Sequence, residues 1–92
     1  MGMISGYAQS KYLVAGVVER GEKVYLIAED GGRRDTLNET FVVNGRFEMS
    51  GKLDRVVPVK VNVVLNGKIE EIANISSFNG GGYFVYSSYD KS

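Results

Sequence analysis

One stretch of this sequence, residues 41–53, reads FVVNGRFEMSGKL and predicts a β-hairpin. Asn44 and Gly45 form the dipeptide that best tolerates the positive φ angles of tight hairpin turns, and strand-favouring apolar residues lie on both sides of it. After the turn, polar and apolar residues alternate, which is typical of a strand with one buried face. The apolar face would hold Phe47, Met49, Gly51 and Leu53, and the polar face Arg46, Glu48, Ser50 and Lys52.

The register of this hairpin depends on the length of its loop. A loop of Asn44 and Gly45 alone would place Phe41 opposite Glu48, whereas a three-residue loop with Gly45 in a bulge places Phe41 opposite Phe47. A directly opposed aromatic pair contributes roughly 0.2–1 kcal/mol relative to alanine. We therefore expect the second register, with Phe41 and Phe47 as neighbours across the hairpin.

The rest of the chain repeats this pattern of short strand-like segments separated by turns. Asn66 and Gly67 predict a second tight turn, and residues 79–82 (NGGG) predict a third. Pro58 has no N–H for a sheet, so we expect it at the start of a strand or on an edge. Seven strands without an amphipathic helix favour an all-β fold, either an antiparallel β-sandwich or a small open barrel built from hairpins. The expected strands cover residues 11–18, 23–28, 34–43, 46–53, 56–65, 68–75 and 83–89.

The segment after the second Asn-Gly turn fits two structures. Ile69, Ile72 and Ala73 would share one face of a helix, but the turn before them implies a returning strand. We expect a strand that is bulged near Glu70 and Glu71.

Composition excludes several classes of function. The chain has 92 residues, enough for one domain with a modest core. Eleven basic and eleven acidic residues cancel, so no net charge draws the protein to nucleic acid or to an anionic membrane. Because the sequence has no His and no Cys, it lacks disulfides, thiolate nucleophiles, Ser-His-Asp triads and the common zinc sites. No apolar run approaches the ~20 residues of a membrane span. We therefore expect no enzyme activity, cofactor, metal ion, nucleic-acid partner or membrane span.

The expected domain organisation has one folded unit. Residues 11–89 would form a single all-β domain, residues 1–10 a disordered N-terminal remnant and residues 90–92 a loose tail. Residues 6–8 (GYA) before Gln9 place small residues at the two positions that a signal peptidase reads, although a frayed N-terminus would look the same. On the first interpretation the protein is exported and its signal peptide has been removed.

A cluster of aromatic residues near the C-terminus is the candidate binding face. Tyr83, Tyr86 and Tyr89, with Phe84 between them, could form a stacking platform for glycans or peptides. Strands also use such residues to build their cores. Alternation puts Tyr83 and Tyr89 on one face and Phe84 and Tyr86 on the other, so at most half of the cluster can face a ligand.

Other candidate sites fit structural roles better. Residues 80–82 (GGG) lack the following Lys-Ser/Thr and the helix start of a phosphate-binding loop, so we interpret them as a hairpin loop. The acidic pairs Glu29-Asp30 and Glu70-Glu71 would point to opposite faces of a strand, which does not suit a general acid and base.

A resemblance to a known family rests on Gly16, on GEKVYL at residues 21–26 and on NGRFEMSGKL at residues 44–53. These residues resemble a β-rich domain of unknown function that lies N-terminal to thioredoxin-like modules in exported thiol-disulfide proteins and lipoproteins of gut bacteria. The resemblance implies structural glycines and strands without catalytic residues, a periplasmic or cell-surface location, and a thioredoxin-like module as partner. The sequence has no Cys-x-x-Cys pair, so oxidoreductase activity is not implied.

Together these patterns predict a non-catalytic, exported accessory domain that acts by contact with another protein or domain. The alternative is a glycan- or peptide-binding module that uses an aromatic strand face. An open sandwich also exposes strand edges, so we expect charged or bulged edges or a homodimer formed by edge pairing.

Overall fold

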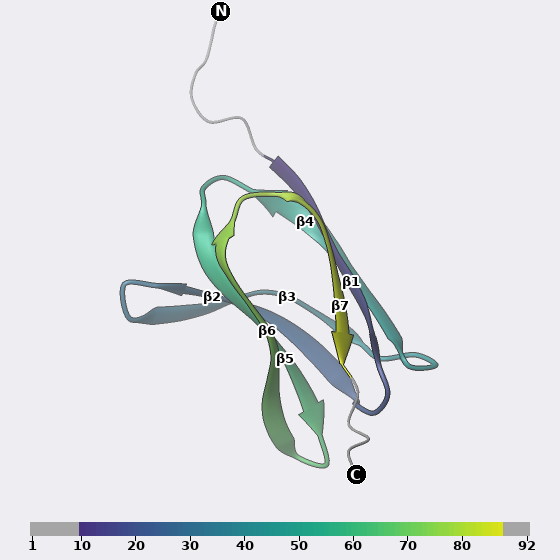
Figure 1. Ribbon diagram of the computed structural model, residues 1–92. Helices are drawn as coiled ribbons and strands as arrows, with labels where there is room; N and C mark the ends of the chain where they lie inside the picture. The colour runs from purple at the N-terminus through teal and green to yellow at the C-terminus, as the bar shows by residue number, and fades with distance from the viewer. Residues whose placement is uncertain (1–9, 88–92) are drawn as a thin grey trace, which may run out of the picture.

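The computed structural model describes residues 10–87, which form two β-sheets packed face to face (Figure 1). The smaller sheet has the order β4-β1-β7 and the larger sheet the order β3-β2-β5-β6. The predicted all-β sandwich is confirmed, and the sheets do not close into a barrel. The pairing of β1 with β7 is parallel, whereas the other pairs are antiparallel. The strands are β1 (Ser10–Val18), β2 (Lys23–Asp30), β3 (Arg33–Phe41), β4 (Arg46–Leu53), β5 (Val57–Leu65), β6 (Lys68–Phe78) and β7 (Gly81–Ser87).

Alternating side chains from both sheets fill the core. Along β2, Val24, Leu26 and Ala28 point inward and are buried, as their spacing predicts. Burying one valine or leucine side chain stabilises the fold by roughly 1.5–3 kcal/mol. The other buried apolar residues are Tyr12, Val14 and Val18 of β1, Phe47, Met49 and Leu53 of β4, Val57, Val59, Val61 and Val63 of β5, Phe78 of β6 and Val85 of β7.

The Asn-Gly corner turns with two residues, so the predicted three-residue loop is wrong. Asn44 and Gly45 both adopt positive φ angles, 54° and 75°. The Val43 N–H donates to the Arg46 carbonyl over 2.9 Å, and the Arg46 N–H donates to the Val43 carbonyl over 3.0 Å. Both φ angles suit the primed turns that tight hairpins prefer.

The expected neighbours Phe41 and Phe47 are not paired across this turn, which is a second correction. Beyond the Val43–Arg46 bridge the two strands separate: β3 pairs with β2, and β4 pairs with β1. Phe47 lies opposite Gly16 and is buried in the core, whereas Phe41 lies opposite Lys23 and is 66% exposed. Burial of a whole aromatic ring outweighs a cross-strand pair worth under about 1 kcal/mol.

Residues 68–78 form the strand β6, so the helix alternative is wrong. Val61 pairs with Ala73, and the next residue of β5 pairs with Glu71, which leaves Ile72 as an extra residue. The bulge therefore lies next to the acidic pair where the sequence predicted it. A second irregularity in the β5–β6 ladder falls at Pro58, which is the second residue of β5 and has no N–H to donate.

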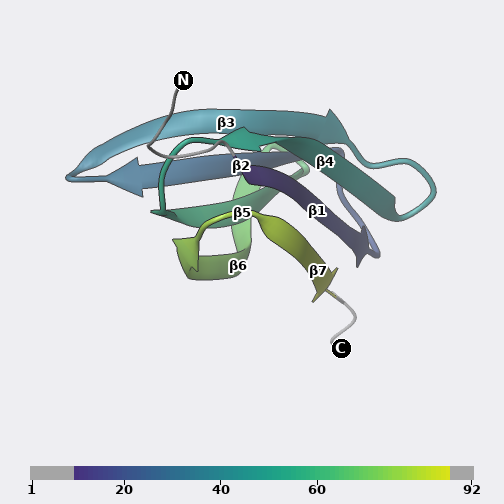
Figure 2. The ribbon, with the colours of Figure 1, turned by 90° about the horizontal axis from the view of Figure 1, so that it is seen from above.

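The glycine-rich residues after β6 connect the two sheets, so their interpretation as a hairpin loop is wrong. β6 ends in the larger sheet and β7 begins in the smaller sheet, next to β1 (Figure 2). Gly80 makes this crossing with a φ of 105°, and a Cβ there would lie 2.7 Å from the Cβ of Ser10. The crossing thus needs glycine for its backbone angle and for its close approach to the start of β1.

One amide side chain ties the two sheets together along the β3–β4 side. The Nδ2 group of Asn38 in β3 donates to the Tyr12 hydroxyl and to the Ser50 carbonyl, each over 3.0 Å. Tyr12 is buried, so its hydroxyl has little access to water. The two hydrogen bonds of Asn38 therefore connect the larger sheet to the smaller sheet at the edge formed by β3 and β4.

Replacing Tyr12 with phenylalanine is expected to lower the free energy of unfolding by about 0.5–1.5 kcal/mol, because it removes one internal hydrogen bond and keeps the ring. Urea denaturation of the wild type and the variant would measure this. Tyr86→Phe is the control, since Tyr86 is exposed and should change stability by less than about 0.5 kcal/mol. Equal stability of Tyr12→Phe and the wild type would contradict the bond's role.

Candidate functional site

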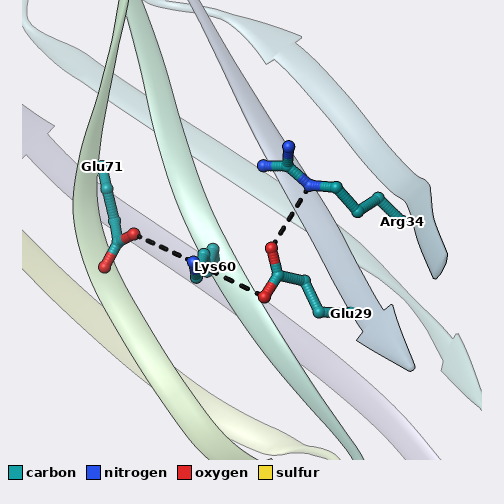
Figure 3. Close-up of polar contacts among 4 residues, drawn as sticks. All are labelled: Glu29, Arg34, Lys60 and Glu71. Carbon is teal, nitrogen blue, oxygen red and sulfur yellow. Dashed lines mark ion pairs between the residues drawn. The ribbon is translucent and has the colours of Figure 1, made fainter. Parts of the chain in front are cut away.

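The two outer faces of the sandwich differ in chemistry. On the larger sheet a chain of ion pairs crosses all four strands (Figure 3). Arg34 Nε lies 3.2 Å from one carboxylate oxygen of Glu29, and Lys60 Nζ lies 3.4 Å from the other. The same ammonium lies 3.5 Å from Glu71 Oε1. Alternating charges of this kind suit a face that stays in water.

Lys60 is the centre of this chain, and its replacement by methionine is expected to cost about 0.5–1 kcal/mol of folding stability. The change removes two ion pairs and leaves Glu29 and Glu71 without their shared cation. The loss should shrink at high salt, because salt screens exposed charges. Urea denaturation at low and high salt would measure it, with Lys52→Met as an exposed control. A loss that is equal at both salt concentrations would contradict the electrostatic cause.

The outer face of the smaller sheet carries apolar side chains on two adjacent strands, β1 and β7. Ala15 of β1 lies beside Phe84 of β7, and Val17 lies beside Tyr86. Phe84 and Tyr86 are 70% and 69% exposed, although the outward face of a strand usually carries polar side chains. With Leu13, which is also exposed, these residues form a patch that we call the apolar strip: Leu13, Ala15, Val17, Phe84 and Tyr86.

An open groove of about 590 Å³ adjoins the apolar strip. Phe84 and Val17 contribute to its lining, together with Phe41 from the end of β3. Arg46 and Glu48 of β4 also line it, and they add one cation and one carboxylate beside the apolar surface. This groove can hold an apolar side chain and orient a polar group next to it.

The structure separates the residues of the predicted tyrosine face. Tyr83 points inward, and its ring centroid lies 5.0 Å from that of the buried Phe78. Tyr86 points outward on the same strand, and Tyr89 lies outside the described residues. Alternation anticipated the opposite directions of Tyr83 and Tyr86.

The apolar strip includes residues of β1 that were not among the predicted binding residues. The signal was present, because the run YLVAGVV places apolar residues at every position of residues 12–18 and so on both faces of the strand. A strand with one solvent-exposed face should alternate instead. Leu13 and Val17 could have been found by that departure from alternation.

The acidic side chains within the described residues 10–87 are the candidates for a metal site or an acid–base pair. Among these residues, no group of three His, Cys, Asp or Glu side chains could hold a metal ion. Glu70 and Glu71 pair with residues of opposite orientation on β5, Val63 and Asn62, so the two carboxylates do not converge. This part of the chain contains no helix that could span a membrane.

No family model, no curated protein and no solved structure matches this chain. The surface that the fold presents is therefore the basis for a functional proposal. Its most distinctive feature is the contrast between the ion-paired face and the apolar strip.

Proposed function

We propose that this chain is a non-catalytic domain that acts by contact with another protein or domain through the apolar strip. The single observation that supports it is the exposure of Phe84 and Tyr86 on an outer face, while the opposite outer face is crossed by ion pairs. Contiguous exposed apolar patches rimmed by polar residues are typical of interaction sites.

The composition of the patch suits a protein interface. Aromatic side chains are enriched at the centres of interfaces, where their burial removes apolar area from water at about 25 cal/mol per Å². Arg46 and Glu48 lie on the adjoining strand and would form a polar rim. In a complex Phe84 and Tyr86 would be the anchors, and the two charges would set the orientation.

The location and the partner rest on the sequence resemblance. An exported protein of the periplasm or cell surface, with a thioredoxin-like module as its partner, fits the family that Gly16, residues 21–26 and residues 44–53 together resemble. A homodimer through sheet edges is a further form of contact that an open sandwich allows.

A titration with a thioredoxin-like module from an exported bacterial thiol-disulfide protein tests this proposal. Amide resonances of the ¹⁵N-labelled chain are followed by NMR, and we expect shifts at Leu13, Val17, Phe84 and Tyr86. Phe84→Ser should weaken binding at least about tenfold, the loss of one interface anchor. Ile69→Ser is the matched control, since Ile69 is 66% exposed but lies on β6. Equal effects of both variants would contradict the assigned surface.

A second candidate function is glycan or peptide binding by the same face. It is favoured by two exposed aromatic rings, Phe84 and Tyr86, that lie two residues apart on one strand face. Titration against a glycan panel, with Tyr86→Ala and Tyr89→Ala as variants, would test it. The absence of binding in the wild-type chain removes this candidate.

A further inference from the structure

The sandwich has four edge strands, and β7 differs from the other three. β3 carries Arg33, Arg34, Asp35 and Glu39, and its pairing with β2 contains a bulge. β6 carries Lys68, Glu70 and Glu71 and two irregularities. β4 carries Arg46, Glu48 and Lys52, and its Ser50 carbonyl already accepts from Asn38.

Charges, bulges and covering groups are the usual protection of a sheet edge. β7 reads GGYFVYS, with no charge, no proline and a regular register against β1.

The backbone groups on the free side of β7 can be identified. A Cβ placed on Gly16 would overlap the Val85 carbonyl oxygen, so that carbonyl faces β1. Backbone groups of successive residues in a strand point to opposite sides. The N–H and C=O groups of Gly82, Phe84 and Tyr86 therefore face away from β1, and no strand within residues 10–87 pairs with them.

The larger sheet extends beneath this open edge. β3 and β4 lie on one side of the sandwich, where Asn38 of β3 donates to the Ser50 carbonyl of β4, and β6 and β7 lie on the other side (Figure 2). There the ring of Phe78 at the end of β6 packs against the ring of Tyr83 in β7. The inner residues of β5 are fully buried, but their pairing partners Ala73 and Ile75 on β6 are only partly buried. Four strands thus face three, and a fourth strand of the smaller sheet would lie beside β7 and over β6.

We infer that an extended, uncharged segment of a partner polypeptide adds to β7 as the fourth strand of the smaller sheet. The inference rests on the proposed contact function and gives it a binding mode, β-strand addition. The segment's inward side chains would cover Ala73 and Ile75, and its outward side chains would lie beside Phe84 and Tyr86.

The charge and the shape of the β7 edge determine which kind of segment can bind there. β7 offers no counter-charge, so a charged side chain entering the edge would lose water without compensation, and an uncharged alternation of apolar residues fits best. A second copy of the whole sandwich fits less well, because its own β6 would reach the place that β6 of the first copy occupies. A single strand can lie over β6.

The test uses two capped peptides that alternate valine and threonine. One has an ordinary backbone, and the other is N-methylated on the residues whose N–H groups would face β7. We expect micromolar binding of the first peptide by NMR titration, with shifts on β7 and β6, and at least tenfold weaker binding of the second. A third peptide with lysine in place of threonine should also bind at least tenfold more weakly.

A variant of the protein provides an independent test of strand addition. Phe84→Pro removes an N–H that faces away from β1, so β7 should keep its pairing with β1 while peptide binding falls at least tenfold below that of Phe84→Ala.

Equal binding of the methylated and ordinary peptides would overturn strand addition, and so would shifts confined to another surface. Concentration-dependent dimerisation in sedimentation would also overturn it, because a second copy would then cover the edge. Binding of the thioredoxin-like module at the apolar strip without peptide binding would leave the proposed function in place and remove only strand addition.

Discussion

Replacing Phe78 with alanine is expected to lower the free energy of unfolding by about 3–5 kcal/mol. Phe78 is fully buried, and its ring packs against Tyr12 at 5.3 Å and against Tyr83 at 5.0 Å between centroids. These contacts join the end of β6 to both β1 and β7. The variant would lose the transfer energy of the ring and leave a cavity between the rings of Tyr12 and Tyr83.

Phe84→Ala is the matched control for this prediction, because it removes the same side chain from an exposed position on β7. Its stability should stay within about 0.5 kcal/mol of the wild type. Urea denaturation of both variants, with the slope compared as well as the midpoint, makes the measurement. A loss below about 1 kcal/mol for Phe78→Ala would contradict the packing described for the β6–β7 crossing.

Replacing Gly16 with alanine is expected to lower the free energy of unfolding by about 1–3 kcal/mol or more. A Cβ at this position would overlap the Val85 carbonyl oxygen and would lie 2.7 Å from Cε2 of Phe47. The aromatic ring could shift, but the carbonyl belongs to the backbone of β7 and cannot move without disturbing the parallel ladder. The change therefore tests how closely β7 is held against β1.

Gly82→Ala is the control for the glycine variant, because nothing lies within 4 Å of its Cβ position. Alanine is favoured over glycine inside a strand by roughly 0.5–1 kcal/mol, so this variant should be as stable as the wild type or slightly more stable. Thermal and urea denaturation of both alanine variants would measure the difference. Equal stability of Gly16→Ala and Gly82→Ala would contradict the close approach of β1 and β7.

Much of the strand content could be predicted from alternation and turn chemistry. Val24, Leu26 and Ala28 point inward as their spacing predicts, and both Asn44 and Asn66 adopt the positive φ angle that an Asn-Gly turn requires. The pairing of strands across the two sheets could not be predicted. A tight turn fixes the reversal of the chain, but not how far the two strands stay paired after it.

The same limit applies to the candidate site. Residues 83–86 alternate between two apolar faces, Tyr83 with Val85 and Phe84 with Tyr86, so the pattern alone does not say which face is buried. The parallel pairing with β1 determines which face of β7 is buried, because it turns Val85 toward the core. Local propensity contains no information on that long-range contact, and so the apolar strip becomes visible only in the fold.

Amide hydrogen exchange along β7, measured by NMR on the wild-type chain without a partner, tests most directly the claim that this strand presents an open edge. We expect the amides of Tyr83 and Val85, which face β1, to exchange on the order of a hundredfold or more slowly than those of Phe84 and Tyr86. Equal protection of all four amides would show that the outer side of β7 is already paired, and would contradict an open edge at β7.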